Sequence, residues 1–179
     1  MALYHGTNAK ISVVDLSKGR NRTDFGKGFY LADKLETACR WAANKVDLSG
    51  GIPTVLRYEV NNDLYRIHGK RFDEIPNLDW LEFICQNRQR NSIDTNKIEP
   101  RHDCNWVSGP IADDKVYDVV KEYMTGVITA DEAIQKARAL QQTFQLSLHT
   151  ALALSFVDDV DVWFKQYKNN GWSKNWIKR

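Results

Sequence analysis

Strand-like and helix-like segments follow one another in this chain without a regular strand–helix–strand rhythm. Apolar and polar residues alternate over residues 54–60 and again over residues 143–148, which is typical of strands with one buried face. The same patterns predict strands at 3–5, 64–67 and 104–108, helices at 33–46, 79–88, 116–124 and 129–140, and loops at 8–29 and 89–102. The mixture predicts an α+β fold, and 179 residues suit one domain over residues 1–179.

Two of the expected helices begin with the spacing of a capping box. Thr129 is followed three residues later by Glu132, and Asp33 is followed in the same way by Glu36. Each pair predicts a helix N-terminus at that point. At the other end of the chain, the basic and tryptophan-containing residues 172–179 are expected to form a frayed, solvated tail.

The composition argues against several classes of protein. A net charge of +2 is too small to indicate a nucleic-acid surface. The three cysteines and four histidines lack zinc-ligand spacing, so no metal site is expected, and the cysteine content fits a reducing compartment. Neither a signal peptide nor an apolar stretch of about 18 residues is present, so we expect a cytoplasmic protein without a membrane partner. Delivery into a target cell by a dedicated secretion system would need neither signal.

A first candidate site is His5-Gly6-Thr7, at the end of the expected first strand. The imidazole of His5 can offer a ring nitrogen to a ribose hydroxyl, and Gly6 would let a ligand amide approach the backbone. The alternative interpretation is a simple turn that ends the strand.

A second candidate is the run DFGKGFYLA over residues 24–32. Its two glycines, Gly26 and Gly28, precede the aromatic pair Phe29-Tyr30, and Tyr30 could stack on a flat ligand. A glycine turn followed by a buried aromatic pair is the alternative.

A third candidate is Gln145, on the polar side of its expected strand. Its side-chain amide can hold a ribose hydroxyl if it points into a cleft. Solvent exposure on a sheet with one buried face is the alternative.

These features together resemble the ADP-ribosyltransferase superfamily. The similarity is to its histidine–tyrosine branch, which includes diphtheria toxin and the poly-ADP-ribose polymerases. It rests on the early His-Gly pair, on the Gly-Lys-Gly-Phe-Tyr-Leu-Ala run and on the following helix with Ala38, Trp41 and Ala42. Residues 3–42 carry this match.

The remainder of the chain is similar to an uncharacterised bacterial family of the same superfamily. The matching segments are WLEF at 80–83, NR at 87–88, GPIADD at 109–114, QLSLHT at 145–150 and AL at 153–154. The resemblance implies a split β-sheet core with flanking helices. It also implies a mono-ADP-ribosyltransferase that cleaves the nicotinamide–ribose bond of NAD and uses no metal.

The resemblance assigns roles to individual residues. His5 would bind a ribose hydroxyl, Gly6 the nicotinamide carboxamide, and Tyr30 the nicotinamide face. The same NAD pocket would include the residues Thr7, Gly28 and Phe29. Arg20 would meet the diphosphate, although an arginine on a loop surface is an equal alternative.

The third residue of the site departs from the family pattern. Many active relatives carry a glutamate on a late strand, where this chain offers Gln145. Glutamine keeps the hydrogen bond but lacks the charge that best stabilises a ribosyl cation. The candidate replacement carboxylates are Glu59, Asp113 and Asp114.

Three functions therefore stay open at this point. The first is transfer of ADP-ribose to a protein or nucleic-acid acceptor, in a bacterial toxin or effector that has a neutralising partner. The second is NAD glycohydrolysis, with water as the acceptor. The third is an inactive module that binds NAD or ADP-ribose, which the glutamine at position 145 favours.

Overall fold

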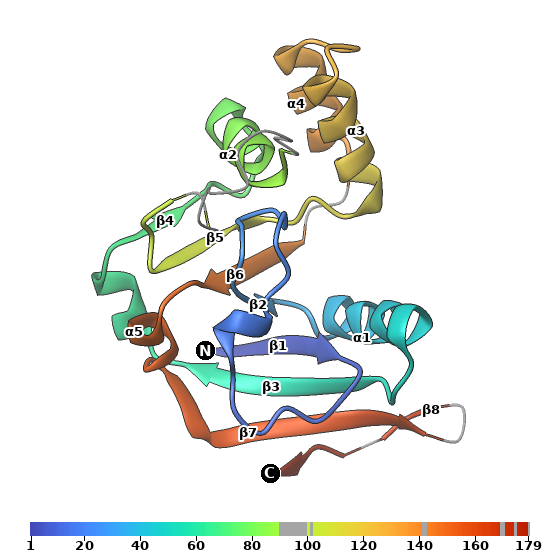
Figure 1. Cartoon of the computed structure of the whole chain (residues 1–179), viewed down its shortest axis with the longest axis vertical. Helices are drawn as coiled ribbons and strands as arrows, with labels where there is room; N and C mark the ends of the chain where they lie inside the picture. The colour runs from blue at the N-terminus through green and yellow to red at the C-terminus, as the bar shows by residue number, and fades with distance from the viewer. Residues whose placement is uncertain (90–99, 101, 141–142, 169–170, 174, 179) are drawn as a thin grey trace.

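Nine strands form one mixed sheet in the part of the chain that the computed structural model describes, residues 1–89, 100, 102–140, 143–168, 171–173 and 175–178. The strands are β1 (Ala2–Thr7), β2 (Phe29–Ala32), β3 (Thr54–Val60), β4 (Gly69–Arg71), β5 (Trp106–Pro110), β6 (Phe144–Leu148), β7 (Val157–Lys168), β8 (Gly171–Trp172) and β9 (Ile177–Lys178). Their order is β4–β5–β6–β2–β1–β3–β7–β8, and β9 also pairs with β7 (Figure 1). β4 and β5 are parallel, whereas β1, β2, β3, β6 and β7 pair antiparallel to their neighbours.

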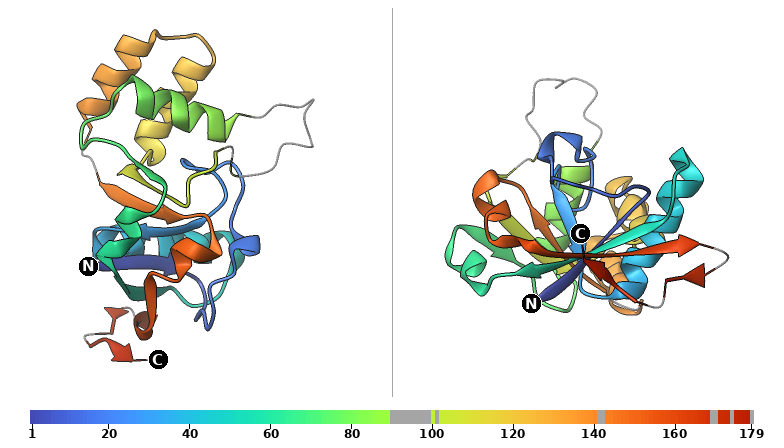
Figure 2. Two further views of the ribbon diagram at one scale, coloured as in Figure 1. Left: turned by 90° about the vertical axis from the view of Figure 1, so that its left-hand side faces the viewer. Right: turned by 90° about the horizontal axis from the view of Figure 1, so that it is seen from below.

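The helices are segregated around this sheet, which confirms the predicted α+β class. They are α1 (Leu35–Ser49), α2 (Leu78–Arg88), α3 (Asp114–Met124), α4 (Ala130–Arg138) and α5 (Ala151–Leu154), with 3-10 turns η1 (Leu16–Lys18) and η2 (Asn62–Arg66). α1 lies along β1, whereas α2, α3 and α4 gather at the β5 end of the molecule (Figures 1 and 2). No helix in the described ranges is long and apolar enough for a membrane crossing.

β6 lies between two apolar cores. One core contains Leu146 and Leu148 with side chains of β2 and β3, and the other is built largely from α2, α3 and α4. The alternative interpretation of Gln145, solvent exposure on a sheet with one buried face, is therefore wrong. Gln145 and Ser147 are both buried, because the second core covers the face that they share with Tyr30.

Several predicted elements agree with the structure, and others are displaced by local hydrogen bonds. The capping box of Thr129 and Glu132 is present. The box predicted at Asp33 is wrong, because the Asp33 carboxylate instead accepts from the backbone N–H of Phe144 at 3.2 Å. The strand predicted at 64–67 is the turn η2, since the side chain of Asn61 caps it by accepting from the N–H of Asp63.

The strand predicted at 104–108 begins two residues later, as β5. The long strand β7 was not predicted; it pairs with β3 on one side and with β8 and β9 on the other. The frayed tail is wrong where the structure describes it, because β8 and β9 pair with β7 and Trp176 stacks on Tyr4 with ring centroids 5.9 Å apart. The loop predicted at 89–102 lies mostly outside the described residues.

Candidate functional site

The three predicted site segments lie on neighbouring strands. β2 carries Tyr30 and lies between β1, which carries His5, and β6, which carries Gln145. β2 and β6 pair at four positions, whereas β1 and β2 pair at one, Tyr4 with Ala32. β1 pairs with β3 at six positions. The sheet therefore has two halves joined by a single backbone pair, and His5 directly follows that pair.

The imidazole of His5 is buried and links β1 to β2. Its Nδ1 lies 2.7 Å from the backbone oxygen of Tyr30, and its ring stacks on Phe29 with centroids 4.5 Å apart. Because a carbonyl oxygen only accepts, Nδ1 carries the proton and Nε2 is left as an acceptor. Burial, and to a smaller extent the charge of Lys45, lower the pKa of His5 to about 3. His5 is therefore a neutral hydrogen-bond acceptor near pH 7.

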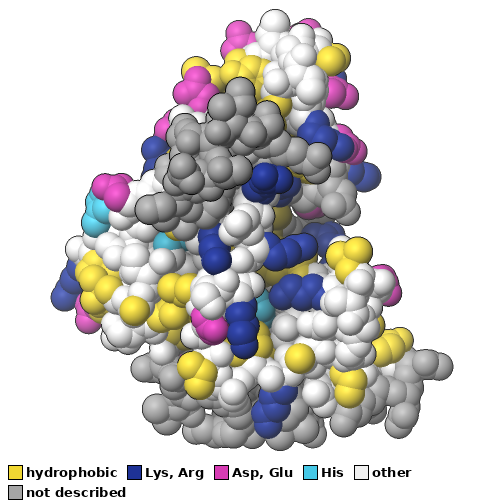
Figure 3. All heavy atoms as spheres, in the orientation of Figure 1, with side chains coloured by type: hydrophobic (Ala, Val, Ile, Leu, Met, Phe, Trp, Pro, Cys, Tyr) yellow, Lys and Arg dark blue, Asp and Glu magenta, His cyan; other side chains and the backbone are white. Residues whose placement is uncertain are grey.

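One cation, Lys45, lies beside this acceptor nitrogen, and the exposed Arg20 lies near Lys45. The Nζ atom of Lys45, on α1, is 3.4 Å from Nε2 of His5. Burial, followed by the charge of nearby Arg20, lowers the pKa of Lys45 to about 8. Neither Lys45 nor Arg20 forms an ion pair with a carboxylate of the described residues. Figure 3 shows Lys and Arg side chains around a hollow in the middle of one face of the molecule. Unneutralised cations beside a hydroxyl acceptor favour an anionic, hydroxylated ligand.

The glycines of the two motifs are required by close packing. A Cβ atom on Gly6 would overlap the backbone oxygen of Ala38 and lie 2.8 Å from the nitrogen of Ala42, so Gly6 lets α1 approach β1. A Cβ atom on Gly28 would lie 2.6 Å from the ring of His149. Thr7, at the end of β1, is also buried. The helix thus occupies the side of Gly6 on which the sequence predicts the approach of a ligand amide.

Tyr30 anchors the loop that precedes β2. Its hydroxyl donates to the backbone oxygen of Gly26 at 2.7 Å, accepts from the N–H of Phe25 at 3.0 Å, and lies 2.8 Å from Oγ1 of Thr23. Burial raises the pKa of the phenol, so it stays protonated. Its ring packs beside Phe25 and edge-on to His149, with centroids 6.5 Å apart in each case. The side chain is half-buried, intermediate between a stacking platform and a core residue.

Gln145 is held by a buried carboxylate, Asp24. The Gln145 Nε2 atom donates to Oδ2 of Asp24 at 2.7 Å, and that oxygen also accepts from the N–H of Ala112 at 3.0 Å. The other oxygen, Oδ1, accepts from Nε of Arg88 at 2.8 Å and from a terminal guanidinium nitrogen. The guanidinium carbon of Arg88 lies 3.9 Å from the centroid of the Tyr117 ring. Asp24 is 4% exposed, so one carboxylate joins the loop before β2 to α2, β6 and the segment before α3.

Sequence reasoning gave Asp24 and Arg88 no role. Both stand within segments that carry the family resemblance, Asp24 at the start of DFGKGFYLA and Arg88 in the NR pair. The signal for Asp24 is its position beside a glycine turn and a buried aromatic pair, where carboxylates are rare. A carboxylate buried there requires a cationic partner, which is the signal for an arginine such as Arg88.

The carboxylates proposed from the sequence as replacements lie elsewhere. Glu59 accepts from the guanidinium of Arg57 at 2.6 Å on β3. Asp113 caps α3 and lies 3.8 Å from Arg40 of α1. The side chain of Asp114 is outside the described part of the structure. Asp24 is therefore the carboxylate in contact with Gln145 among the described residues.

A second set of buried hydrogen bonds holds the C-terminal end of the loop before β2. Oγ of Ser147 lies 2.8 Å from Nε2 of His149, and Nδ1 of His149 lies 2.9 Å from the backbone oxygen of Lys27. Since the carbonyl accepts, Nδ1 carries the proton, and Nε2 shares the single proton of the serine hydroxyl with the backbone oxygen of Val107, which lies 3.1 Å from Oγ. Burial lowers the pKa of His149 to about 4. β6 and the residue that follows it thus hold the loop at two points, through Gln145 with Asp24 and through His149 with Lys27.

Comparisons with known proteins place the chain in a family by its sequence. A family model described as "Protein of unknown function (DUF3990)" matches residues 1–158, which include all the site residues described above. No curated protein and no solved structure matches the chain significantly. Because the model covers most of the chain, this protein belongs to the DUF3990 family.

Proposed function

We propose that this protein binds NAD at the junction of β1 and β2, and that it transfers ADP-ribose from NAD to a protein or nucleic-acid acceptor. The observation that carries the proposal is the surroundings of His5. Its Nε2 atom is a neutral acceptor, Lys45 lies 3.4 Å from it, and Arg20 lies near Lys45; neither cation pairs with a carboxylate of the described residues. NAD presents ribose hydroxyls next to a diphosphate, which is the matching combination of donor and anion.

The topology gives a second line of support. The half β4–β5–β6–β2 and the half β1–β3–β7 meet at the single pair of Tyr4 with Ala32. An ADP-ribosyltransferase-like core is expected to be a split sheet of this kind. The segments that resemble that superfamily, residues 3–7 and 24–32, lie on the two sides of this junction.

The chemistry asked of the residues is modest. The bond between nicotinamide and ribose breaks, and its electron pair leaves with neutral nicotinamide. A lone pair of the acceptor then forms a bond to the anomeric carbon, and the acceptor loses a proton. His5 would hold a ribose hydroxyl and Tyr30 would contact the nicotinamide ring. Gln145 would turn its Oε1 toward the ribose, because its Nε2 is committed to Asp24.

One observation favours a second candidate, a module that binds NAD or ADP-ribose without cleaving it. The charge of Asp24 is neutralised by Arg88, and position 145 carries an amide. A ribosyl cation would therefore meet a dipole where relatives offer a charge, and a dipole stabilises a cation less. Both candidates need the same pocket around His5.

The deciding experiment is incubation of the full chain with NAD labelled on its adenosine half, with and without cell lysate. We expect a raised melting temperature, release of nicotinamide, and label on a lysate macromolecule. Nicotinamide release without labelling would indicate hydrolysis, and a melting shift without release would indicate the binding module. Lys45→Met should abolish the shift, whereas the exposed Lys115→Met is the matched control. A folded wild-type chain without any melting shift at millimolar NAD would overturn the proposal.

A further inference from the structure

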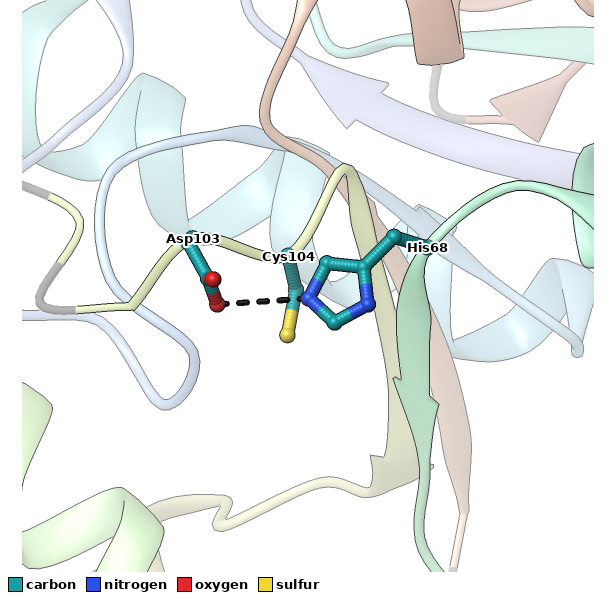
Figure 4. A group of neighbouring side chains, drawn as sticks. All are labelled: His68, Asp103 and Cys104. Carbon is teal, nitrogen blue, oxygen red and sulfur yellow. Dashed lines mark hydrogen bonds and ion pairs between the residues drawn. The ribbon is translucent and has the colours of Figure 1, made fainter.

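A cluster of three potential metal ligands lies at the start of the parallel pair β4–β5, in residues that the proposed NAD site does not use. It consists of His68, Asp103 and Cys104, whose ligand atoms all lie within 4.8 Å of one another. Nε2 of His68 lies 3.3 Å from Oδ1 of Asp103. Figure 4 shows the imidazole ring directed toward the carboxylate, with the sulfur of Cys104 beside them. Since 35 residues separate His68 from Asp103, sequence spacing could not reveal the cluster.

The backbone under these side chains is held in place by its own hydrogen bonds. Gly69 on β4 pairs with Trp106 on β5, which brings the segments before the two strands together. Asn105 donates to the backbone oxygen of His68 twice, from its own N–H and from Nδ2, at 3.0 Å in each case. Asn105 in turn accepts from the hydroxyl of Thr150 at 2.8 Å. The three ligands are therefore carried by a preorganised scaffold.

The donor set selects a class of cation. An imidazole nitrogen, a carboxylate oxygen and a thiolate sulfur suit Zn²⁺ and its spectroscopic substitute Co²⁺, whereas Mg²⁺ and Ca²⁺ prefer oxygen ligands alone. The cysteine is buried, and the histidine and aspartate side chains are 61% and 92% exposed. An ion on these three ligands would keep a fourth position open to solvent, as three-ligand zinc sites do.

We propose that His68, Asp103 and Cys104 form a binding site for a zinc-class divalent cation. The site would do more than join β4 to β5, because His102 lies next to it. Nδ1 of His102 accepts from the backbone N–H of Cys104 at 3.2 Å, so its Nε2 carries the proton and donates to the backbone oxygen of Phe25 at 2.8 Å. Cation binding would thereby stiffen the loop that Tyr30 and Asp24 hold.

The test is a Co²⁺ titration of the full metal-free chain, with the thiols kept reduced. The expected result is a thiolate-to-cobalt charge-transfer band in the near ultraviolet, which Zn²⁺ removes by displacing the Co²⁺. Cys104→Ser should abolish the band. The matched control Cys39→Ser changes a cysteine on α1 and should keep it.

A second variant covers the case in which the buried Cys104→Ser fails to fold. His68→Ala changes an exposed side chain, and it should weaken Co²⁺ binding roughly tenfold or more while the circular dichroism spectrum is unchanged. A wild-type chain without a charge-transfer band would overturn the proposal, and so would a band of unchanged affinity in His68→Ala. None of these measurements uses NAD, so their outcome is independent of the proposed activity.

Discussion

The side-chain amide of Gln145 donates to the carboxylate of Asp24 at 2.7 Å, although 121 residues separate the two in the chain. This contact changes what the glutamine at the third site position means. The carboxylate of Asp24 orients this amide, and the carboxylate is itself held by a salt bridge with Arg88. Substitutions that move the carboxylate between positions 24 and 145 test the role of this contact.

Gln145→Glu should lower the free energy of unfolding at neutral pH, because two buried carboxylates would then meet at hydrogen-bond distance. The pKa of the new carboxyl would be raised above its value in the unfolded chain. The loss of unfolding free energy in this variant should therefore be absent below the pKa of the unfolded chain, and it should grow as the pH rises through the pKa of the folded chain. Urea unfolding between about pH 5 and about pH 8 measures this. A deficit that does not vary with pH would mean that the new side chain turns away from Asp24.

The double variant Asp24→Asn with Gln145→Glu keeps one carboxylate and transfers it to β6. We expect it to recover stability relative to Gln145→Glu alone, since the like charges no longer meet. It should also release nicotinamide faster than the wild type if stabilisation of the ribosyl cation limits the rate. The control is Asp24→Asn alone. It leaves the Arg88 guanidinium without its carboxylate and should lower the free energy of unfolding by about 3 kcal/mol. Equal turnover in all four proteins would remove Gln145 from the catalytic step.

Tyr30→Phe separates the two roles of this side chain. The substitution removes the hydroxyl that holds residues 23–26 and should cost about 1–3 kcal/mol of unfolding free energy, because buried partners lose their bond. The ring remains, so NAD affinity should change less than in Tyr30→Ala. Denaturation and NAD titration of both variants give the comparison. Tyr167→Phe, an exposed tyrosine on β7, should match the wild type in both assays.

The buried neutral histidines should make the fold sensitive to acid. The pKa of His5 is lowered to about 3 and that of His149 to about 4, from 6.5 in the unfolded chain. The unfolded chain therefore binds protons first, and stability is lost as the pH falls below about 6.5, by roughly 1.4 kcal/mol per pH unit for each proton. Urea unfolding at several pH values measures the slope. His149→Gln should reduce it by one proton, and an unchanged slope would contradict the assignment.

NAD binding should weaken as the pH rises from about 7 to about 9, because Lys45 with a pKa of about 8 loses its charge over this range. Acidification from about pH 7 to about pH 5 should have little effect through His5, which stays neutral there. Calorimetric titration with NAD at each pH tests both arms. In Lys45→Arg, which keeps a positive charge over this range, the alkaline weakening should disappear; if it persists, another group is responsible.

The elements predicted correctly are those whose signals are local. Thr129 and Glu132 form both bonds of a capping box within one turn. The strand predicted at 54–60 coincides with β3, in which buried and half-buried residues alternate from Leu56 to Val60. The strand β7 was not predicted, and its aspartates are of a residue type that is depleted in strands. Its N-terminal half has the sequence VDDVDV, and it is a strand because β3 offers it a partner along most of its length.

The candidate site shows the same division between local and distant information. The motifs at residues 5–7 and 24–32 predicted segments that the fold does bring together on β1 and β2. What the sequence could not show is which distant side chains complete them. Lys45 approaches His5 from α1, and Arg88 and Gln145 reach Asp24 from α2 and β6.

The single backbone pair between Tyr4 and Ala32 has a mechanical consequence. A sheet resists shear through rows of backbone hydrogen bonds, and between β1 and β2 this row consists of one residue pair. Sliding of the two halves is opposed there chiefly by side chains, such as His5 on the carbonyl of Tyr30 and Arg40 facing Asp113. A ligand that binds both halves would oppose their relative movement, so its binding should slow amide hydrogen exchange along β1 and β2.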